Sequence, residues 1–110
     1  MKKKKVFKTI ATHMLTQKKA SQDRNTCLYR DGYGLSCAIG ILINDDNYSK
    51  ELEGYDITDT RVSTAVANSL GSPPLNAKDR SFLGALQDFH DHSEPQYWRG
   101  ELDIFSMKHF

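Results

Sequence analysis

The two cysteines of this 110-residue chain lie within one short block, residues 27–40. Between them stands Asp31-Gly32, a strong turn signal that joins two β-prone runs, so we predict a small hairpin. With a loop over residues 31–33, Cys27 lies opposite Cys37 on one face, whereas a longer loop puts the two thiols on opposite faces. The facing register segregates the apolar residues better, and we favour it.

A zinc site is one chemistry that these thiols could serve. Structural zinc prefers thiolate and imidazole ligands, so His90 or His92 would complete a set with Cys27 and Cys37. The nine residues between the cysteines exceed the spacing of an ordinary zinc knuckle, and the two histidines point to different faces of a helix. Zinc therefore stays an alternative, and thiols packed as small hydrophobic groups are the simpler interpretation.

A reactive thiol is the second chemistry. The apolar run that starts at Cys37 predicts a helix capped by Ser36, and the positive end of a helix stabilises a thiolate. His90, oriented by Asp88 or Asp91, could act as the base for this thiol. The residues after Cys37 match no known nucleophile motif, so we assign no catalytic residue, no metal and no cofactor.

Helical periodicity dominates the chain, because apolar residues recur three and four positions apart between turn signals. Asn76 and either Thr58 or Asp59 are predicted helix caps, and Gly71 and Pro95 are predicted stops. We predict a single domain over residues 1–110, mainly α-helical and compact, with about five helices and one small β-hairpin. The predicted helices cover residues 6–15 and 37–43, the segments from Asp59 to Gly71 and from Asn76 to Pro95, and residues 97–110.

The net charge of +1 hides an uneven distribution. Residues 1–30 carry nine Lys or Arg against Asp23 alone, a charge of +8, which leaves −7 on the remainder. We predict a basic N-terminal arm over residues 1–5 that, together with Tyr29 and Tyr33, could bind nucleic acid through phosphate contacts and base stacking. No nucleic-acid-binding motif accompanies these residues. The basic residues concerned are Lys2, Lys3, Lys4, Lys5, Lys8, Lys18, Lys19, Arg24 and Arg30.

An acidic segment rich in tyrosine follows the apolar run. It is not a calcium loop, since Lys50 stands where such a loop requires glycine and Asp56 where it requires a bidentate glutamate. Acidic side chains suit a basic partner, and tyrosines offer contact area with few rotatable bonds. The predicted binding residues are Asp45, Asp46, Tyr48, Glu51, Glu53 and Tyr55, with Tyr97 as a further interface candidate.

Several short motifs carry a family resemblance: Cys27-Leu28-Tyr29-Arg30, Cys37-Ala38-Ile39-Gly40, Glu53-Gly54, Leu86-Gln87-Asp88-Phe89-His90-Asp91 and Trp98. Through them the chain resembles a group of small uncharacterised proteins encoded by bacteriophages and bacteria. The resemblance implies an accessory protein that binds and inhibits or modulates a host protein, such as a defence or nucleic-acid-processing component. It also implies one shared structural centre, made of Cys27, Tyr29, Cys37, Gly40, His90 and Asp91.

The composition of the chain indicates the cellular compartment in which we expect the protein. No run approaches the roughly 18 apolar residues that a membrane span needs, so we expect no membrane association. Two cysteines are too few for a disulfide scaffold and suit a reducing compartment, so we expect a cytoplasmic protein. The oligomeric state stays open.

Overall fold

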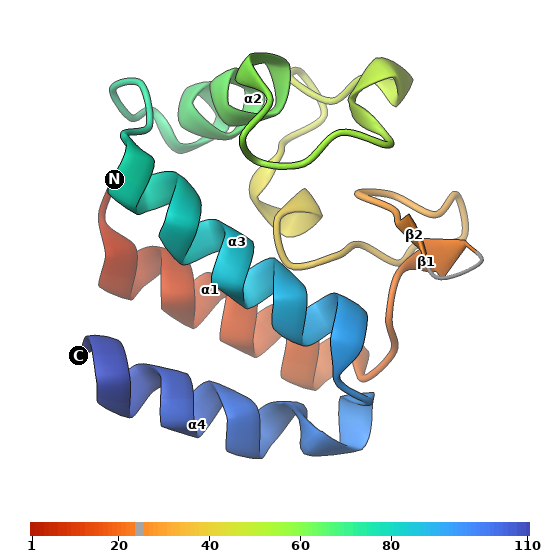
Figure 1. Ribbon diagram of the computed structural model, residues 1–110. Helices are drawn as coiled ribbons and strands as arrows, with labels where there is room; N and C mark the ends of the chain where they lie inside the picture. The colour runs from red at the N-terminus through yellow and green to blue at the C-terminus, as the bar shows by residue number, and fades with distance from the viewer. Residues whose placement is uncertain (24–25) are drawn as a thin grey trace.

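The computed structural model describes residues 1–23 and 26–110 and is mainly helical (Figure 1). Within this part of the chain it has four α-helices, slightly fewer than predicted. The helices are α1 (Lys3–Gln17), α2 (Thr60–Leu70), α3 (Ala77–His92) and α4 (Trp98–His109). The 3-10 turns are η1 (Gly40–Leu42), η2 (Lys50–Leu52) and η3 (Pro95–Tyr97), and the strands are β1 (Gln22–Asp23) and β2 (Thr26–Cys27).

Helices α2 and α3 begin and end where the turn residues predict. The Asn76 side chain accepts a hydrogen bond from the N–H of Asp79 at 2.8 Å, and the Asp79 carboxylate accepts from the N–H of Asn76 at 3.2 Å, which completes a capping box. Of the two candidate caps for α2, it is Asp59 that accepts from a first-turn N–H, at 2.9 Å. Gly71 ends α2. Local sequence thus determines these helix boundaries.

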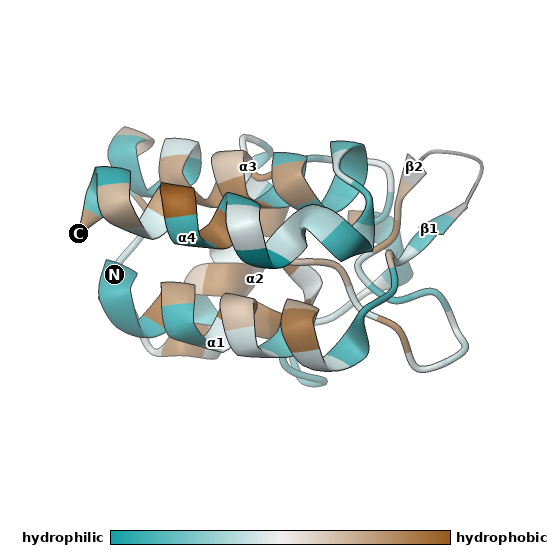
Figure 2. Cartoon of the chain, turned by 90° about the horizontal axis from the view of Figure 1, so that it is seen from below, coloured by the Kyte–Doolittle hydropathy of each residue, from teal (hydrophilic) through white to brown (hydrophobic). Residues whose placement is uncertain are grey.

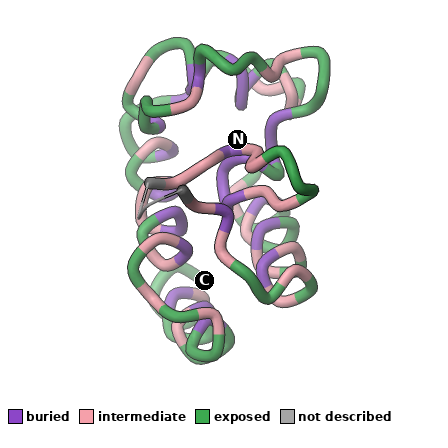
Figure 3. The backbone as a smooth tube through the Cα atoms, turned by 90° about the vertical axis from the view of Figure 1, so that its right-hand side faces the viewer, coloured by how far each residue is buried: buried purple, intermediate pink, exposed green. Residues whose placement is uncertain are grey.

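The hydrophobic core lies where the helices meet. Helix α4 packs against α1 and α3, and η1 lies between α1 and α2 (Figure 1). The buried residues occupy the inner sides of these helices (Figure 3). The largest fully buried apolar side chains are Trp98, Ile10, Met14, Ile39, Leu83, Leu86, Val62 and Val66.

The prediction of an α-helix over residues 37–43 is wrong, although the segment is buried apart from Ile41. Only the η1 turn forms, and no side chain caps it. Ser36 instead binds α1, because its N–H donates to Gln17 Oε1 at 3.0 Å. The N–H of Ile39 donates to the side chain of Gln87 at 3.0 Å, so a tertiary contact takes the amide that would start a helix.

The predicted hairpin around Asp31-Gly32 is not formed. Strands β1 and β2 pair with each other instead, and across the Asp31 loop the described residues form one antiparallel bridge, from Arg30 to Ser36, in neither register considered. One Asp31 carboxylate oxygen accepts the N–H groups of Tyr33 at 2.7 Å and Leu35 at 3.0 Å. These local side-chain bonds close the loop in place of a strand ladder.

The N-terminal lysines are not a separate arm, because α1 already begins at Lys3. The Lys3 ammonium lies 5.7 Å from the centre of the Phe82 ring, while Lys4 and Lys5 are exposed. None of the described helices is long and apolar enough to cross a membrane.

Candidate binding cleft and its polar floor

A cleft of about 790 Å³ lies between α3 and residues 54–58. Its α3 wall is low, because Ala77, Ser81, Gly84 and Ala85 present small side chains there. The rest of the lining comes from Cys27, Tyr29, Ile39, Gly54, Tyr55, Asp56, Ile57, Thr58, Arg80, Gln87, Asp88 and Asp91. The cleft therefore opens directly onto part of the predicted structural centre.

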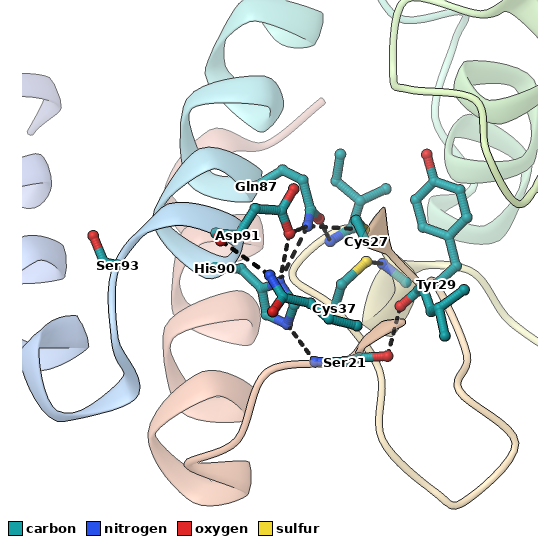
Figure 4. A network of polar contacts seen from close by, with 12 residues as sticks. Ser21, Cys27, Tyr29, Cys37, Gln87, His90, Asp91 and Ser93 are labelled. Atoms are coloured by element: carbon teal, nitrogen blue, oxygen red, sulfur yellow. Dashed lines mark hydrogen bonds and ion pairs between the residues drawn. The ribbon is translucent and has the colours of Figure 1, made fainter. Parts of the chain in front are cut away.

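A buried histidine anchors the polar network beside the cleft (Figure 4). His90 Nε2 accepts the N–H of Ser21 at 2.9 Å, so the ring proton is on Nδ1, which donates to Asp91 Oδ1 at 2.8 Å. The imidazole also stacks on Trp98, with ring centres 5.5 Å apart. Both nitrogens of His90 are thus engaged: Nε2 holds the chain before β1 against α3, and Nδ1 is held by Asp91 of the same helix.

Gln87 joins this network to the cysteine block. Its carbonyl oxygen accepts from Ile39, while its amide nitrogen donates to Asp91 Oδ1 at 2.8 Å and to Cys27 Sγ at 3.1 Å. We did not assign Gln87 to the site from sequence. The available signal was its position, four residues before Asp91 and therefore on the same face of the helix.

The two thiols come together, although not through the predicted hairpin. Cys37 is fully buried and accepts the N–H of Gly40 at 3.3 Å, whereas Cys27 is half-buried and lines the cleft. A side-chain hydrogen bond with Cys37 raises the pKa of Cys27, and burial raises it further. Cys27 is therefore protonated at neutral pH, which is the wrong state for a nucleophile.

The other predicted partners of the thiols are placed differently from one another. Asp91, rather than Asp88, contacts His90, and His92 is exposed. No group of three potential ligands among the described residues could hold a metal ion. The arrangement is a hydrogen-bonded support for the cleft wall.

Thiol labelling tests this arrangement. In the native protein we expect iodoacetamide to modify Cys27 slowly and Cys37 only after unfolding, because one thiol is protonated and the other is buried. Mass spectrometry of the alkylated peptides over time gives both rates, and the chain in denaturant provides the reference rate for each site. Faster modification of Cys37 than of Cys27 in the native protein would contradict this arrangement and support the hypothesis that Cys37 is a reactive thiol.

The predicted acidic binding residues divide into two groups. Glu53 is internal, because its carboxylate accepts the N–H groups of Tyr29 at 2.8 Å and Arg30 at 3.1 Å and the hydroxyl of Tyr48 at 2.8 Å. Arg30 lies over the Tyr48 ring at 4.3 Å. Asp46 and Glu51 are exposed, and Asp45 is exposed but pairs with Arg30 at 2.8 Å. Tyr48 and Glu53 therefore stabilise the fold.

Tyr29 lines the cleft and is hydrogen-bonded to another residue of its lining. It is buried, and its hydroxyl donates to the carbonyl of Tyr55, the predicted binding residue at the rim. Burial is the main reason that the pKa of Tyr29 lies above its ordinary value. Tyr29 is thus unavailable for stacking on a nucleic-acid base, whereas Tyr33 is almost fully exposed. Arg24 lies outside the described residues.

The raised pKa of Tyr29 predicts a loss of stability in alkali. Below pH 10 the phenol is protonated in both folded and unfolded chains and adds no pH dependence. Above it the unfolded chain ionises first, so the free energy of unfolding falls by about 1.4 kcal/mol per pH unit. Urea unfolding between pH 8 and 11 should show a shallower decline for Tyr29→Phe than for the wild type. Tyr33→Phe, in the exposed loop, should follow the wild type.

The charge of the cleft is negative. Three carboxylates line it against one guanidinium, that of Arg80, which donates to the carbonyl of Leu75 at 2.6 Å. Hydrogen bonds from Thr58 lower the pKa of Asp56, so this carboxylate stays ionised. Within the described chain, the hydrogen bonds to the Asp91 carboxylate all reach Oδ1, which leaves Oδ2 as an acceptor for a ligand.

In comparisons with known protein families, with curated proteins and with solved structures, no match to this chain was found.

Proposed function

We propose that this protein acts by binding another protein, and that the cleft holds a cationic side chain of that partner. The observation that carries the proposal is the cleft of about 790 Å³, whose lining bears Asp56, Asp88 and Asp91 against Arg80 alone. A lysine or arginine entering it would meet carboxylates on both walls, and the low α3 wall leaves room for the aliphatic part of such a side chain. The protonated Cys27 supports binding over covalent chemistry.

The partner that we propose is a host protein in the bacterial cytoplasm, which the protein would inhibit or modulate. This follows from the resemblance of the cysteine and histidine motifs to small bacteriophage and bacterial proteins. The exposed carboxylates of Asp45, Asp46 and Glu51 would steer a basic partner surface toward the molecule.

Peptide titrations monitored by NMR test the cleft. A short peptide rich in lysine and arginine should shift the amide signals of Gly54, Ile57, Ser81 and Gly84, and a glutamate peptide of equal length should not. Asp88→Lys should abolish these shifts, because Asp88 is exposed and lines the cleft.

The matched control for this titration is Asp46→Lys, which makes the same charge change at an exposed aspartate outside the cleft. It should leave the shifts in place. Equal loss in both variants, or shifts spread over the whole acidic surface, would contradict a specific cleft.

Nucleic-acid binding is the second candidate, and the start of α1 favours it. The first turn contains no acidic residue, and Lys2, Lys4 and Lys5 are exposed around the positive end of the helix. Fluorescence anisotropy with a labelled single strand, repeated over a salt series, tests this candidate. A steep loss of affinity with salt that disappears in a Lys2, Lys4 and Lys5 to glutamine variant would favour it over the cleft proposal.

A further inference from the structure

The two cysteines lie beside each other with their thiols free (Figure 4). A hydrogen bond joins their side chains. Cys27 belongs to β2, at the end of the molecule away from both termini (Figure 2), and lines the cleft. Cys37 has no exposed surface. We call these two residues the dithiol, of which Cys27 is the member that a molecule in the cleft can reach.

The backbone holds the dithiol together independently of the bond between the thiols. An antiparallel bridge joins Arg30 to Ser36, so the chain returns alongside itself. Further along, the chain at Gly40 passes so close to Tyr29 that a Cβ at Gly40 would lie 2.2 Å from the Tyr29 carbonyl oxygen. The segments that carry the two cysteines therefore lie against each other. Such an approach of the backbone is the first requirement for a disulfide.

Each sulfur of the dithiol is also fixed by a donor from the protein. The N–H of Gly40 donates to Cys37 Sγ at 3.3 Å, and the side-chain amide of Gln87 donates to Cys27 Sγ at 3.1 Å. These bonds restrict the rotation of both side chains. Joining the two sulfurs therefore costs little further conformational entropy.

We propose that Cys27 and Cys37 are a site of oxidative modification, at which hydrogen peroxide converts the dithiol into an internal disulfide. The cleft of about 790 Å³ is far larger than hydrogen peroxide and leads this small molecule to Cys27. The proposal goes beyond the binding function, because it concerns the protein's own thiols and holds whatever occupies the cleft.

The reaction takes two steps. In the first, the sulfur of Cys27 gives up its proton and attacks one peroxide oxygen, the O–O bond breaks, and the proton joins the departing hydroxide as water, which leaves a sulfenic acid. In the second, the sulfur of Cys37 attacks the sulfur of Cys27, the S–O bond breaks, and the Cys37 proton leaves with the hydroxide as a second water. The peroxide gains two electrons, and the two thiols together lose two.

The two steps differ in rate. The first is slow, because the thiolate is the nucleophile and the raised pKa of Cys27 keeps this thiol protonated at neutral pH. The second is fast, because the Cys37 side chain is already in contact with the sulfur that it attacks. We therefore expect the disulfide to build up during a long exposure, with little sulfenic acid present at any time.

Mass spectrometry of the folded protein after exposure to hydrogen peroxide tests the proposal. Once the peroxide is removed, any remaining thiols are blocked with iodoacetamide in denaturant. The wild-type monomer should lack both alkyl groups, should have lost the mass of two hydrogen atoms, and should regain both thiols on reduction with dithiothreitol. Circular dichroism should show that the oxidised monomer keeps its helices, since the sulfurs join within the native fold.

Two matched variants test the order of the steps, with circular dichroism to check that each is folded. Cys37→Ala removes the second thiol, so the sulfenic acid at Cys27 should persist and react with dimedone, a reagent that labels sulfenic acids. Cys27→Ala leaves only the buried thiol, which should stay reduced over the same exposure and give no dimedone adduct.

Four outcomes would overturn the proposal. A wild-type chain that keeps both thiols under conditions that oxidise the unfolded chain is not modified at this site. A chain that ends in sulfinic acid or in disulfide-linked dimers has no internal partner for Cys27. A disulfide that appears only with loss of the helical signal is formed by unfolded chains. Equal dimedone labelling of both variants would mean that peroxide reaches Cys37 as readily as Cys27.

Discussion

Replacing Gly40 by alanine is expected to lower the free energy of unfolding by about 3 kcal/mol or more, at or beyond the upper end of overpacking effects. An alanine Cβ here would lie 2.2 Å from the carbonyl oxygen of Tyr29 and 2.8 Å from its carbonyl carbon and Cα. These are backbone atoms, so no side-chain rotation relieves the clash. Moving residue 29 would also strain its N–H bond to Glu53 and its hydroxyl bond to Tyr55.

Gly84→Ala is the matched control, since it adds the same methyl group to a half-buried glycine. Its Cβ would meet only the Cγ2 atom of Ile57, at an ordinary contact distance of 3.7 Å. Because alanine is favoured over glycine inside a helix, we expect this variant to be up to about 1 kcal/mol more stable than the wild type. Urea unfolding of both variants checks the pair. Equal stability of Gly40→Ala and Gly84→Ala would mean that η1 and Tyr29 do not approach each other in this way.

The elements that could be predicted from sequence are those whose signals are local. The capping box of Asn76 and Asp79 and the stop at Gly71 act within a few residues of the chain, and the structure has them as expected. The apolar residues of α3 and α4 recur with helical spacing on one face, so these two helices could also be predicted from local sequence alone. For these helices the prediction is confirmed because no distant contact competes with the local preference.

The errors arose where side chains take backbone hydrogen bonds. The segment after Cys37 has an apolar composition suited to a buried helix, but Gln87 takes the amide of Ile39 and the chain passes close to Tyr29. At Asp31 the turn signal was correctly placed, yet the carboxylate itself binds the loop amides, so the strands do not form. The contact of Gln87 cannot be identified from residues near Ile39 in sequence, whereas the Asp31 carboxylate is local and competes with the strand pairing that the same turn signal predicts.

The candidate site shows the same division. The motifs did bring Cys27, Cys37, His90 and Asp91 to attention, and the structure places these residues in one region. The contribution of Ser21 was not foreseeable, because it uses a backbone N–H that any residue possesses. The cleft itself depends on the placement of residues 54–58 against α3, which follows from tertiary packing.

Glu53→Ala is expected to lower the free energy of unfolding by about 3 kcal/mol, since a hydrogen bond to a charged group contributes about 1.5–3 kcal/mol and the half-buried site admits some water. The change removes the acceptor of two backbone N–H groups, those of Tyr29 and Arg30, and of the Tyr48 hydroxyl. Glu53→Gln keeps one carbonyl oxygen and should lose about half as much.

Glu51→Ala separates this structural role from the binding role predicted for the acidic segment. Glu51 is the same residue type but exposed, so its removal should change stability by less than about 0.5 kcal/mol. If Glu53 served mainly to contact a partner, Glu53→Ala would unfold at the wild-type urea midpoint and weaken binding alone. Two backbone amides donate to the Glu53 carboxylate, so we expect Glu53→Ala to lower stability. Any loss of binding should follow from that loss of stability.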